Sequence, residues 1–291
     1  MLITGKTFEG ERPLYGTSDS DIRECVFGTG ESPLKECKNI NVADSVFTWK
    51  YPLWYCRDVN VKNTKWEEMA RAGVWYTDNI TIDSCHIDAP KNFRRCGNAA
   101  ISNTEFTNAA ETMWKCTGLK LDNVTVRGGD YLAMNSSNIT VNKLDLEGNY
   151  AFDGCSNVEV TKSRLMSKDA FWNCRNVSVR DSYISGEYLG WNSENLTFIG
   201  CTIESDQGMC YIDNLKLIDC KLINTTLAFE FSSVECDIDS DIDSVLNPSS
   251  GMIRCGTIGE LIIEHDRVDR TKTKIKASSV SKTSDRPEWL K

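Results

Sequence analysis

The sequence predicts an all-β fold, a right-handed single-stranded parallel β-helix of about 10–12 coils, with about 20 residues and three strands in each coil. Three observations predict it. An Asn-apolar-polar-apolar motif recurs every 19–21 residues, apolar and polar residues alternate in short runs, and small residues recur at two fixed positions of each repeat. Alternation with a period of two is typical of strands and not of helices.

The recurring motif opens ten successive repeats. The spacing between them is 19 or 20 residues, except for 21 residues between Asp58 and Asn79. The two extra residues fall in "KWEEMARAG", residues 65–73, where we expect one helical turn. Constant spacing places equivalent residues above one another at the strand spacing of about 4.8 Å. The repeats open at Asn39, Asp58, Asn79, Asn98, Gly118, Asn138, Asn157, Asn176, Asn195 and Asn214.

Each repeat contains three short apolar pieces, as Val177-Ser-Val179, Ser182-Tyr-Ile184 and Tyr188-Leu-Gly-Trp191 illustrate. Gly, Asp and Asn separate these pieces, as turns require. A leucine-rich repeat is the alternative fold, because Val179, Ser182 and Ile184 match part of its signature. Leucine does not dominate the repeats, however, and no helical stripe is present. These features favour the β-helix.

The column of motif asparagines predicts a ladder of side-chain amides that bind backbone groups of the turns. The 13 cysteines are expected to be free thiols, most of them in columns at interior corners. Disulfides and metal sites are the alternatives. The sequence has no C-x-x-C motif and only two histidines, so we expect no metal and no cofactor.

The expected domain organisation is one β-helix domain over residues 1–269. Residues 1–20 cap it, residues 21–231 form regular coils, and residues 232–269 form irregular last coils. Residues 270–291 read as a mobile polar tail. The net charge of −9 argues against nucleic-acid binding. The chain lacks a long apolar run and an evident signal peptide, so we expect no membrane contact and a cytoplasmic location.

The residues also carry a family resemblance. The coil length, the asparagine motif and the small-residue columns resemble the pectin-lyase-like right-handed β-helix superfamily. A closer resemblance is to an uncharacterised bacterial family of unknown function within it. The resemblance implies the fold and no established activity, and the polygalacturonase-type motifs are absent. The segments that carry it are "GESPLKE" (30–36), "KYPLWYC" (50–56), "APKNFRRC" (89–96), "NAAETMWKC" (108–116) and "SGEYLGWNS" (185–193).

Tryptophan recurs at the position two residues before the cysteine corner. The residue just before each of these positions is apolar in most repeats, so alternation places the tryptophans outside. An outward row of rings beside carboxylates suits a sugar chain, and it also suits a subunit interface. The predicted substrate-binding residues, hereafter the tryptophan column, are Trp54, Trp75, Arg94, Trp114, Trp172 and Trp191.

Charged side chains on the same face are the candidate catalytic residues. Two outward carboxylates one coil apart could hydrolyse a glycosidic bond, as Asp130 with Asp153 or Glu187 with Asp206. A lyase would use a cationic base, for which Lys168 and Arg94 are candidates. The full set of catalytic candidates is Asp130, Asp153, Lys168, Glu187 and Asp206.

The sequence supports two functional hypotheses. The first is a carbohydrate-binding or carbohydrate-processing protein whose partner is an oligosaccharide. The second is a non-catalytic scaffold whose tryptophan strip is buried in a homo-oligomer. The sequence does not decide whether the chain is an enzyme.

Overall fold

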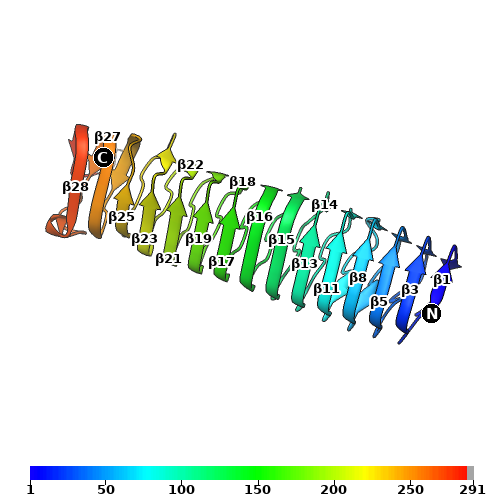
Figure 1. Cartoon of the computed structure of the whole chain (residues 1–291). Helices are drawn as coiled ribbons and strands as arrows, with labels where there is room; N and C mark the ends of the chain where they lie inside the picture. The colour runs from blue at the N-terminus through cyan, green and yellow to red at the C-terminus, as the bar shows by residue number, and fades with distance from the viewer. Residues whose placement is uncertain (287–291) are drawn as a thin grey trace. The chain divides into compact units, whose positions relative to one another are not determined.

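The computed structural model describes residues 1–286 and divides into two compact units, Met1–Gly148 (unit 1) and Asn149–Lys291 (unit 2). Within each unit the chain forms a parallel β-solenoid with coils of about 19 residues. Successive long strands lie side by side within a unit (Figure 1). The predicted all-β solenoid class is therefore confirmed.

Unit 1 contains eight long parallel strands, each paired with the next. They are β1 (Leu2–Thr4), β3 (Ser18–Arg23), β5 (Lys38–Ala43), β8 (Arg57–Lys62), β11 (Asp78–Asp83), β13 (Gly97–Ser102), β15 (Thr117–Val126) and β16 (Ser137–Glu147). The short strands of the second side are β2 (Thr7–Phe8), β4 (Val26–Phe27), β6 (Val46–Phe47), β9 (Lys65–Trp66), β12 (His86–Ile87) and β14 (Glu105–Phe106). A separate pair on the third side is β7 (Leu53–Trp54) and β10 (Val74–Trp75).

Unit 2 repeats this arrangement with seven long strands in its described part. They are β17 (Ser156–Thr161), β19 (Arg175–Arg180), β21 (Glu194–Ile199), β23 (Asp213–Ile218), β25 (Ser233–Asp237), β27 (Ser250–Ile262) and β28 (Thr273–Ser284). The short strands are β18 (Arg164–Met166), β20 (Tyr183–Ser185), β22 (Thr202–Glu204), β24 (Lys221–Leu222) and β26 (Ile242–Leu246). A 3₁₀ turn, η1 (Arg270–Lys272), precedes β28. None of the helices in residues 1–286 has the length and apolar character needed to cross a membrane.

The core of each unit is a set of apolar columns that follow the strand register. Val158 pairs with Val177, and Val160 pairs with Val179, and all four side chains are buried. Phe152 stacks on Phe171 with ring centroids 5.2 Å apart. The inside assignment of the alternating apolar residues is therefore confirmed.

The asparagine column forms a ladder of amides, with a different bonding pattern from the one expected. Asn176 Nδ2 donates to Asn157 Oδ1 at 3.0 Å, and Asn195 Nδ2 donates to Asn176 Oδ1 at 3.0 Å. The partners are thus side chains of adjacent coils and not backbone groups. These residues have φ near +57°, a left-handed conformation that Asn tolerates better than most residues. The conformation explains why the position favours Asn.

The small corner residues connect the backbones of successive coils. Ser193 Oγ accepts a hydrogen bond from the Cys174 N–H at 2.8 Å and donates to the Phe171 carbonyl at 2.7 Å. Cys174 Sγ–H in turn donates to the Phe152 carbonyl at 2.9 Å. Each corner therefore needs a small side chain that can both donate and accept, which Ser, Thr and Cys provide.

Three expectations differ from the structure. The third side is a strand only at β7 and β10, because the residue before the column position is left-handed in the following coils, with φ of +56° at Phe93 and +65° at Met113. Residues 65–73 form no helical turn, since Ala70 N–H donates to Glu67 O in a single tight turn. Counting long strands gives eight plus seven, or fifteen coils, where 10–12 were expected.

The two ends account for the additional coils. Residues 1–20, expected as a cap, contain β1 and β2, and β1 pairs in register with β3. Residues 270–286 of the expected polar tail contain β28, which pairs with β27 over ten residue pairs from Gly251–Thr273 to Ile262–Ser284, and residues 287–291 lie outside the described residues. The sequence of β28 lacks the apolar alternation that marks the other strands, and none of its side chains is buried.

Candidate functional site

The tryptophan column of unit 1 is a continuous stack. Trp54 and Trp75 lie nearly parallel, at 5° with ring centroids 5.1 Å apart. The Arg94 guanidinium lies between Trp75 and Trp114, 4.6 Å and 4.7 Å from the two ring centroids. Bridges that join Trp75 to Arg94 and Arg94 to Trp114 fix the register. The side chains are half-buried, and their flat faces contact one another.

The indole N–H groups of this column are also bonded within the protein. Trp54, Trp75 and Trp114 donate to the carbonyls of Ala72, Lys91 and Tyr131, at 2.6, 2.9 and 2.7 Å. The three accepting residues are left-handed corner residues of the next coil. Contacts within the protein therefore occupy the ring faces and N–H groups of these tryptophans. The column exposes the edges of its rings to solvent.

The column of unit 2 continues into other aromatic residues. Trp172 Nε1 donates to the Tyr188 carbonyl at 3.2 Å, and its ring lies 6.3 Å from that of Trp191. Trp191 contacts Tyr211 at 4.5 Å between ring centroids. Trp172 thus has an N–H contact of the kind seen in unit 1, and the rings of this column are tilted where Trp54 and Trp75 are stacked.

A second outward aromatic row lies in unit 1, one residue beyond the tryptophans. Tyr55 and Tyr76 are 47% and 36% exposed and stack at 4.8 Å with 3° between ring planes. Lys35 and Arg95 lie over the outer faces of this pair, at 5.5 and 5.9 Å. The repeat does not mark this row, because tyrosine occupies the position in only two neighbouring coils.

The candidate catalytic residues of unit 2 have structural partners. Lys168 Nζ and Glu187 Oε2 form an ion pair at 2.9 Å, and the Asp206 carboxylate accepts a hydrogen bond from Thr226. Asp153 Oδ1 accepts from Asn173 at 3.0 Å, at the end of an amide ladder. Asp130 belongs to unit 1, so its pairing with Asp153 stays a prediction.

The environment of Lys168 disfavours a role as a base. The hydrogen bond and charge of Glu187 raise the pKa of Lys168, so its amine holds a proton at neutral pH. Arg94 lies between two tryptophan rings and makes a charged contact with Glu111 at 3.4 Å. Neither cation is in a setting that would activate it as the base of a lyase.

Asp169 is a buried carboxylate that was not predicted from the sequence. It occupies a left-handed corner with φ of +56°, and only 2% of the residue is exposed. Its Oδ1 has no hydrogen-bond partner among the described residues. Burial raises the pKa of Asp169, while Lys168 and a hydrogen bond from Tyr150 lower it. Its burial follows from tyrosines at the equivalent corners of adjacent coils, a tertiary effect that no local motif reveals.

Replacing Asp169 with Asn is expected to stabilise unit 2 at pH 7 by about 1 kcal/mol, because it removes a buried negative charge whose Oδ1 has no hydrogen-bond partner. A raised folded-state pKa means that the folded protein binds more protons, so stability falls as pH rises above the usual aspartate range. Urea unfolding of both proteins from pH 4 to pH 7 tests this. The exposed corner variant Asp181→Asn is the control, and an Asp169→Asn effect that is independent of pH would contradict the assignment.

The cysteines are all free and buried. Burial raises the pKa of Cys37 to about 11 and that of Cys56 to about 12, so both thiols are protonated at neutral pH. Their Sγ–H groups donate to the carbonyls of Leu14 and Leu34 in the preceding coils. No group of three or more metal-ligating side chains occurs within residues 1–286. The predicted interior thiol ladder is confirmed.

An open pocket of about 540 Å³ surrounds Trp49, a residue outside the tryptophan column. Thr48, Glu67, Glu68, Met69 and Asp88 are among the residues that line it. Lys50 lies over the Trp49 ring at 5.4 Å, and no other aromatic ring of the described chain stacks on it. We call this hollow the Trp49 pocket. Trp49 thus differs from the stacked tryptophans in having an indole without a ring partner.

The 21-residue coil supplies one wall of the Trp49 pocket. The two extra residues fall between Trp66 and Val74, and Glu67, Glu68 and Met69 of this segment line the hollow. Buried Asn92 holds the far end of the segment, accepting from Gly73 N–H at 2.8 Å. A Cβ on Gly73 would lie 2.3 Å from Asn92 Oδ1, so only glycine fits there. The 21-residue spacing between Asp58 and Asn79 is the feature of the sequence that could have indicated this site.

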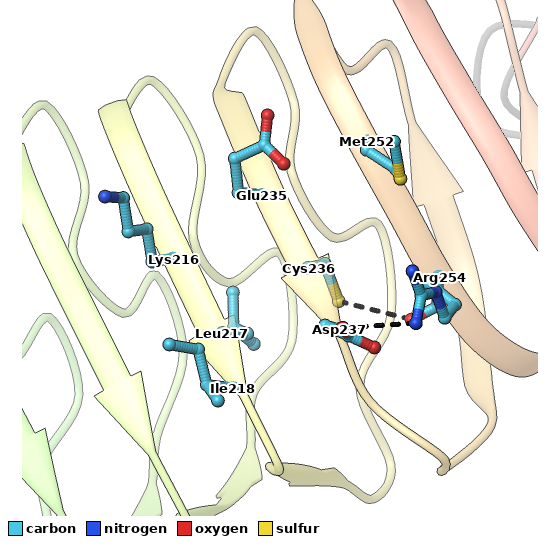
Figure 2. Close-up of a pocket in the computed structure, with 8 residues that line it drawn as sticks. All are labelled: Lys216, Leu217, Ile218, Glu235, Cys236, Asp237, Met252 and Arg254. Carbon is cyan, nitrogen blue, oxygen red and sulfur yellow. Dashed lines mark hydrogen bonds and ion pairs between the residues drawn. The ribbon is translucent and has the colours of Figure 1, made fainter.

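A smaller hollow of about 200 Å³ lies on the outer face of the long strands in unit 2. Figure 2 shows Lys216, Glu235 and Met252 in a row across β23, β25 and β27, and the Asp237–Arg254 ion pair beside them. That ion pair measures 3.3 Å, and both side chains are more than half exposed. The charges of this hollow largely neutralise one another, and it contains no aromatic ring.

The fold defines a parallel β-solenoid of the β-helix class, with stacked outward aromatics and one aromatic pocket outside the stack. Residues 1–276 match the family described as "Protein of unknown function (DUF3737)", and the chain belongs to that family. The resemblance to an uncharacterised family is therefore confirmed. No curated protein sequence matches the chain.

Solved structures of other β-helix proteins align over most of the chain at low identity. The surface protein and adhesin PfbA of Streptococcus pneumoniae has 9% identity and a TM-score of 0.41, covering 97% of this chain and 88% of its own. The mannuronan C-5 epimerase AlgE6 A-module of Azotobacter vinelandii has 8% identity and a TM-score of 0.38, covering 98% and 92%. The tailspike protein of E. coli bacteriophage HK620, as a mutant, has 11% identity and a TM-score of 0.38, covering 94% and 67%.

Proposed function

We propose that this protein is a saccharide-binding β-solenoid whose binding surface is the Trp49 pocket. The observation that carries the proposal is the Trp49 ring, which has no aromatic partner and lines an open hollow with carboxylates and hydroxyls. A flat ring accepts the C–H face of a sugar, and polar groups around it bond the hydroxyls. Among the stacked tryptophans, Trp75 lies between the Trp54 ring and the Arg94 guanidinium, whereas Trp49 has only the Lys50 ammonium beside its ring.

The site favours saccharide binding over catalysis of glycoside hydrolysis. Glu67 is ion-paired with Lys65 at 3.4 Å, and Asp88 accepts a hydrogen bond from Thr107 at 2.8 Å. Glycoside hydrolysis needs one carboxyl group held protonated near a second that is ionised. The pocket is open and polar, and such surroundings favour recognition over acid catalysis.

Replacing Trp49 with Ala is expected to weaken oligosaccharide binding at least fivefold, because stacking on an aromatic ring contributes on the order of 1–3 kcal/mol where nucleobases are the ligand. Calorimetric titration with tetrasaccharides of several neutral and charged sugars measures this. Tyr76→Ala, in the exposed tyrosine row, is the matched control and should bind as the wild type does. Equal binding by Trp49→Ala and wild type would contradict the proposal.

A homo-oligomeric scaffold is the second candidate, favoured by the exposed Tyr55–Tyr76 stack. Exposed rings of this kind are common in subunit interfaces. On this hypothesis analytical ultracentrifugation gives a mass above 32.7 kDa, and the double variant Tyr55→Asp/Tyr76→Asp returns to 32.7 kDa. A wild-type protein of 32.7 kDa at all concentrations would exclude it.

A further inference from the structure

The Trp49 pocket carries an excess of negative charge. Glu67, Glu68 and Asp88 line it, and Lys65 is the one cation among its lining residues in the described chain. Lys65 is already paired with Glu67. The Glu68 carboxylate makes no hydrogen bond or ion pair within residues 1–286. Lys50, which lies over the Trp49 ring, is paired with Glu31 at 3.6 Å, so the Glu68 carboxylate is left for a ligand.

From this arrangement we infer that the ligand is an amino sugar, a hexose that carries a free amine. This inference rests on the proposed saccharide-binding function and specifies its ligand. The charge alone would suit any cation, but Trp49 adds a flat apolar surface for a sugar ring. The ammonium of the sugar would pair with Glu68, because the Lys50 ammonium already lies over the Trp49 ring at 5.4 Å.

The remaining lining groups fit the hydroxyls of the same ligand. Thr48 Oγ1 donates to the Phe27 carbonyl at 3.1 Å, which leaves its lone pairs free to accept. Asp88 accepts one bond from Thr107 and has further acceptor capacity. A volume of about 540 Å³ lies in the range of small-molecule sites. The Gly73–Asn92 hydrogen bond holds the end of the segment that carries the lining residues Glu67, Glu68 and Met69.

The test is calorimetric titration with four probes, the tetramers of glucosamine, N-acetylglucosamine and glucose, and tetralysine. The glucosamine tetramer is expected to bind about fivefold or more tightly than the other two sugars at low salt, and less selectively at 0.5 M NaCl. Glu68→Gln should remove most of this preference and leave binding of the glucose tetramer unchanged. Glu235→Gln, in the hollow of Figure 2, is the charge-matched control.

The outcomes separate the inference from the proposed function. Equal affinity for the glucosamine and glucose tetramers overturns the amino-sugar inference and leaves saccharide binding intact. Tetralysine binding as tightly as the glucosamine tetramer overturns it as well, since the pocket would then recognise charge alone. Failure of all three sugars to bind overturns both proposals.

Discussion

Replacing Val160 with Asp is expected to destabilise unit 2 by roughly 4–5 kcal/mol or more. Val160 is fully buried and pairs with Val179 in the next coil. An aspartate there has only apolar neighbours in its column and must either remain charged without a partner or take up a proton. Such a loss is a large part of the stability of a typical domain, about 5–15 kcal/mol.

Thermal and urea unfolding measure this loss, with Glu159→Asp as the matched control on the same strand. The Glu159 side chain is exposed, so this change should alter stability by about 0.5 kcal/mol or less. A Val160→Asp protein that unfolds at the wild-type temperature would contradict the inside and outside assignment of β17.

Phe171→Ala is expected to reduce the free energy of unfolding by about 3–5 kcal/mol. The ring is fully buried and stacks on Phe152 at 9° between ring planes, so its removal leaves a cavity in the core of unit 2. The loss should appear as a lower urea midpoint with an unchanged slope.

The adjacent residue provides the comparison, because Trp172 points away from the same core. Trp172→Ala removes a half-buried ring and one hydrogen bond to Tyr188, so we expect a smaller loss of about 1–2 kcal/mol. If Trp172→Ala proved more damaging than Phe171→Ala, the alternation along this segment would be wrong. Urea unfolding of the two variants in parallel decides the order.

The repeat predicted the fold because burial in a solenoid is periodic. Residues such as Val160 and Val179 occupy one column, and a regular spacing of 19 residues reveals that column without any structure. The corner serines and cysteines were also predictable as interior positions. The hydrogen bonds that these residues make between coils, such as those of Ser193, depend on the exact distance between coils. They could not be predicted from the sequence.

The functional site was less predictable than the fold. Alternation places Trp54 and Trp75 outside the core, but their stacking follows from the spacing between coils, which brings equivalent rings face to face. Trp49 lies outside the tryptophan column, so comparing equivalent positions of the repeats does not find it. The longer coil between Asp58 and Asn79 marked its location, because an insertion into a regular coil must bulge outward.

The C-terminal strand illustrates a different limit. β28 pairs along its length with β27, yet its side chains are exposed or half-exposed on both faces. Strand prediction from alternation requires one buried face, and this terminal coil has none. Its lysines suit the edge of a sheet, where charge discourages pairing with other chains.

The most direct test of the central claim is to follow the indole N–H signals of the protein by NMR during titration with the glucosamine tetramer. The Trp49 signal, assigned from Trp49→Phe, is expected to shift with saturation, because this ring lines the open pocket. Signals of Trp54, Trp75 and Trp114 should stay in place, because their N–H groups are bonded to backbone carbonyls. Shifts confined to the stacked tryptophans, with Trp49 unchanged, would contradict the account.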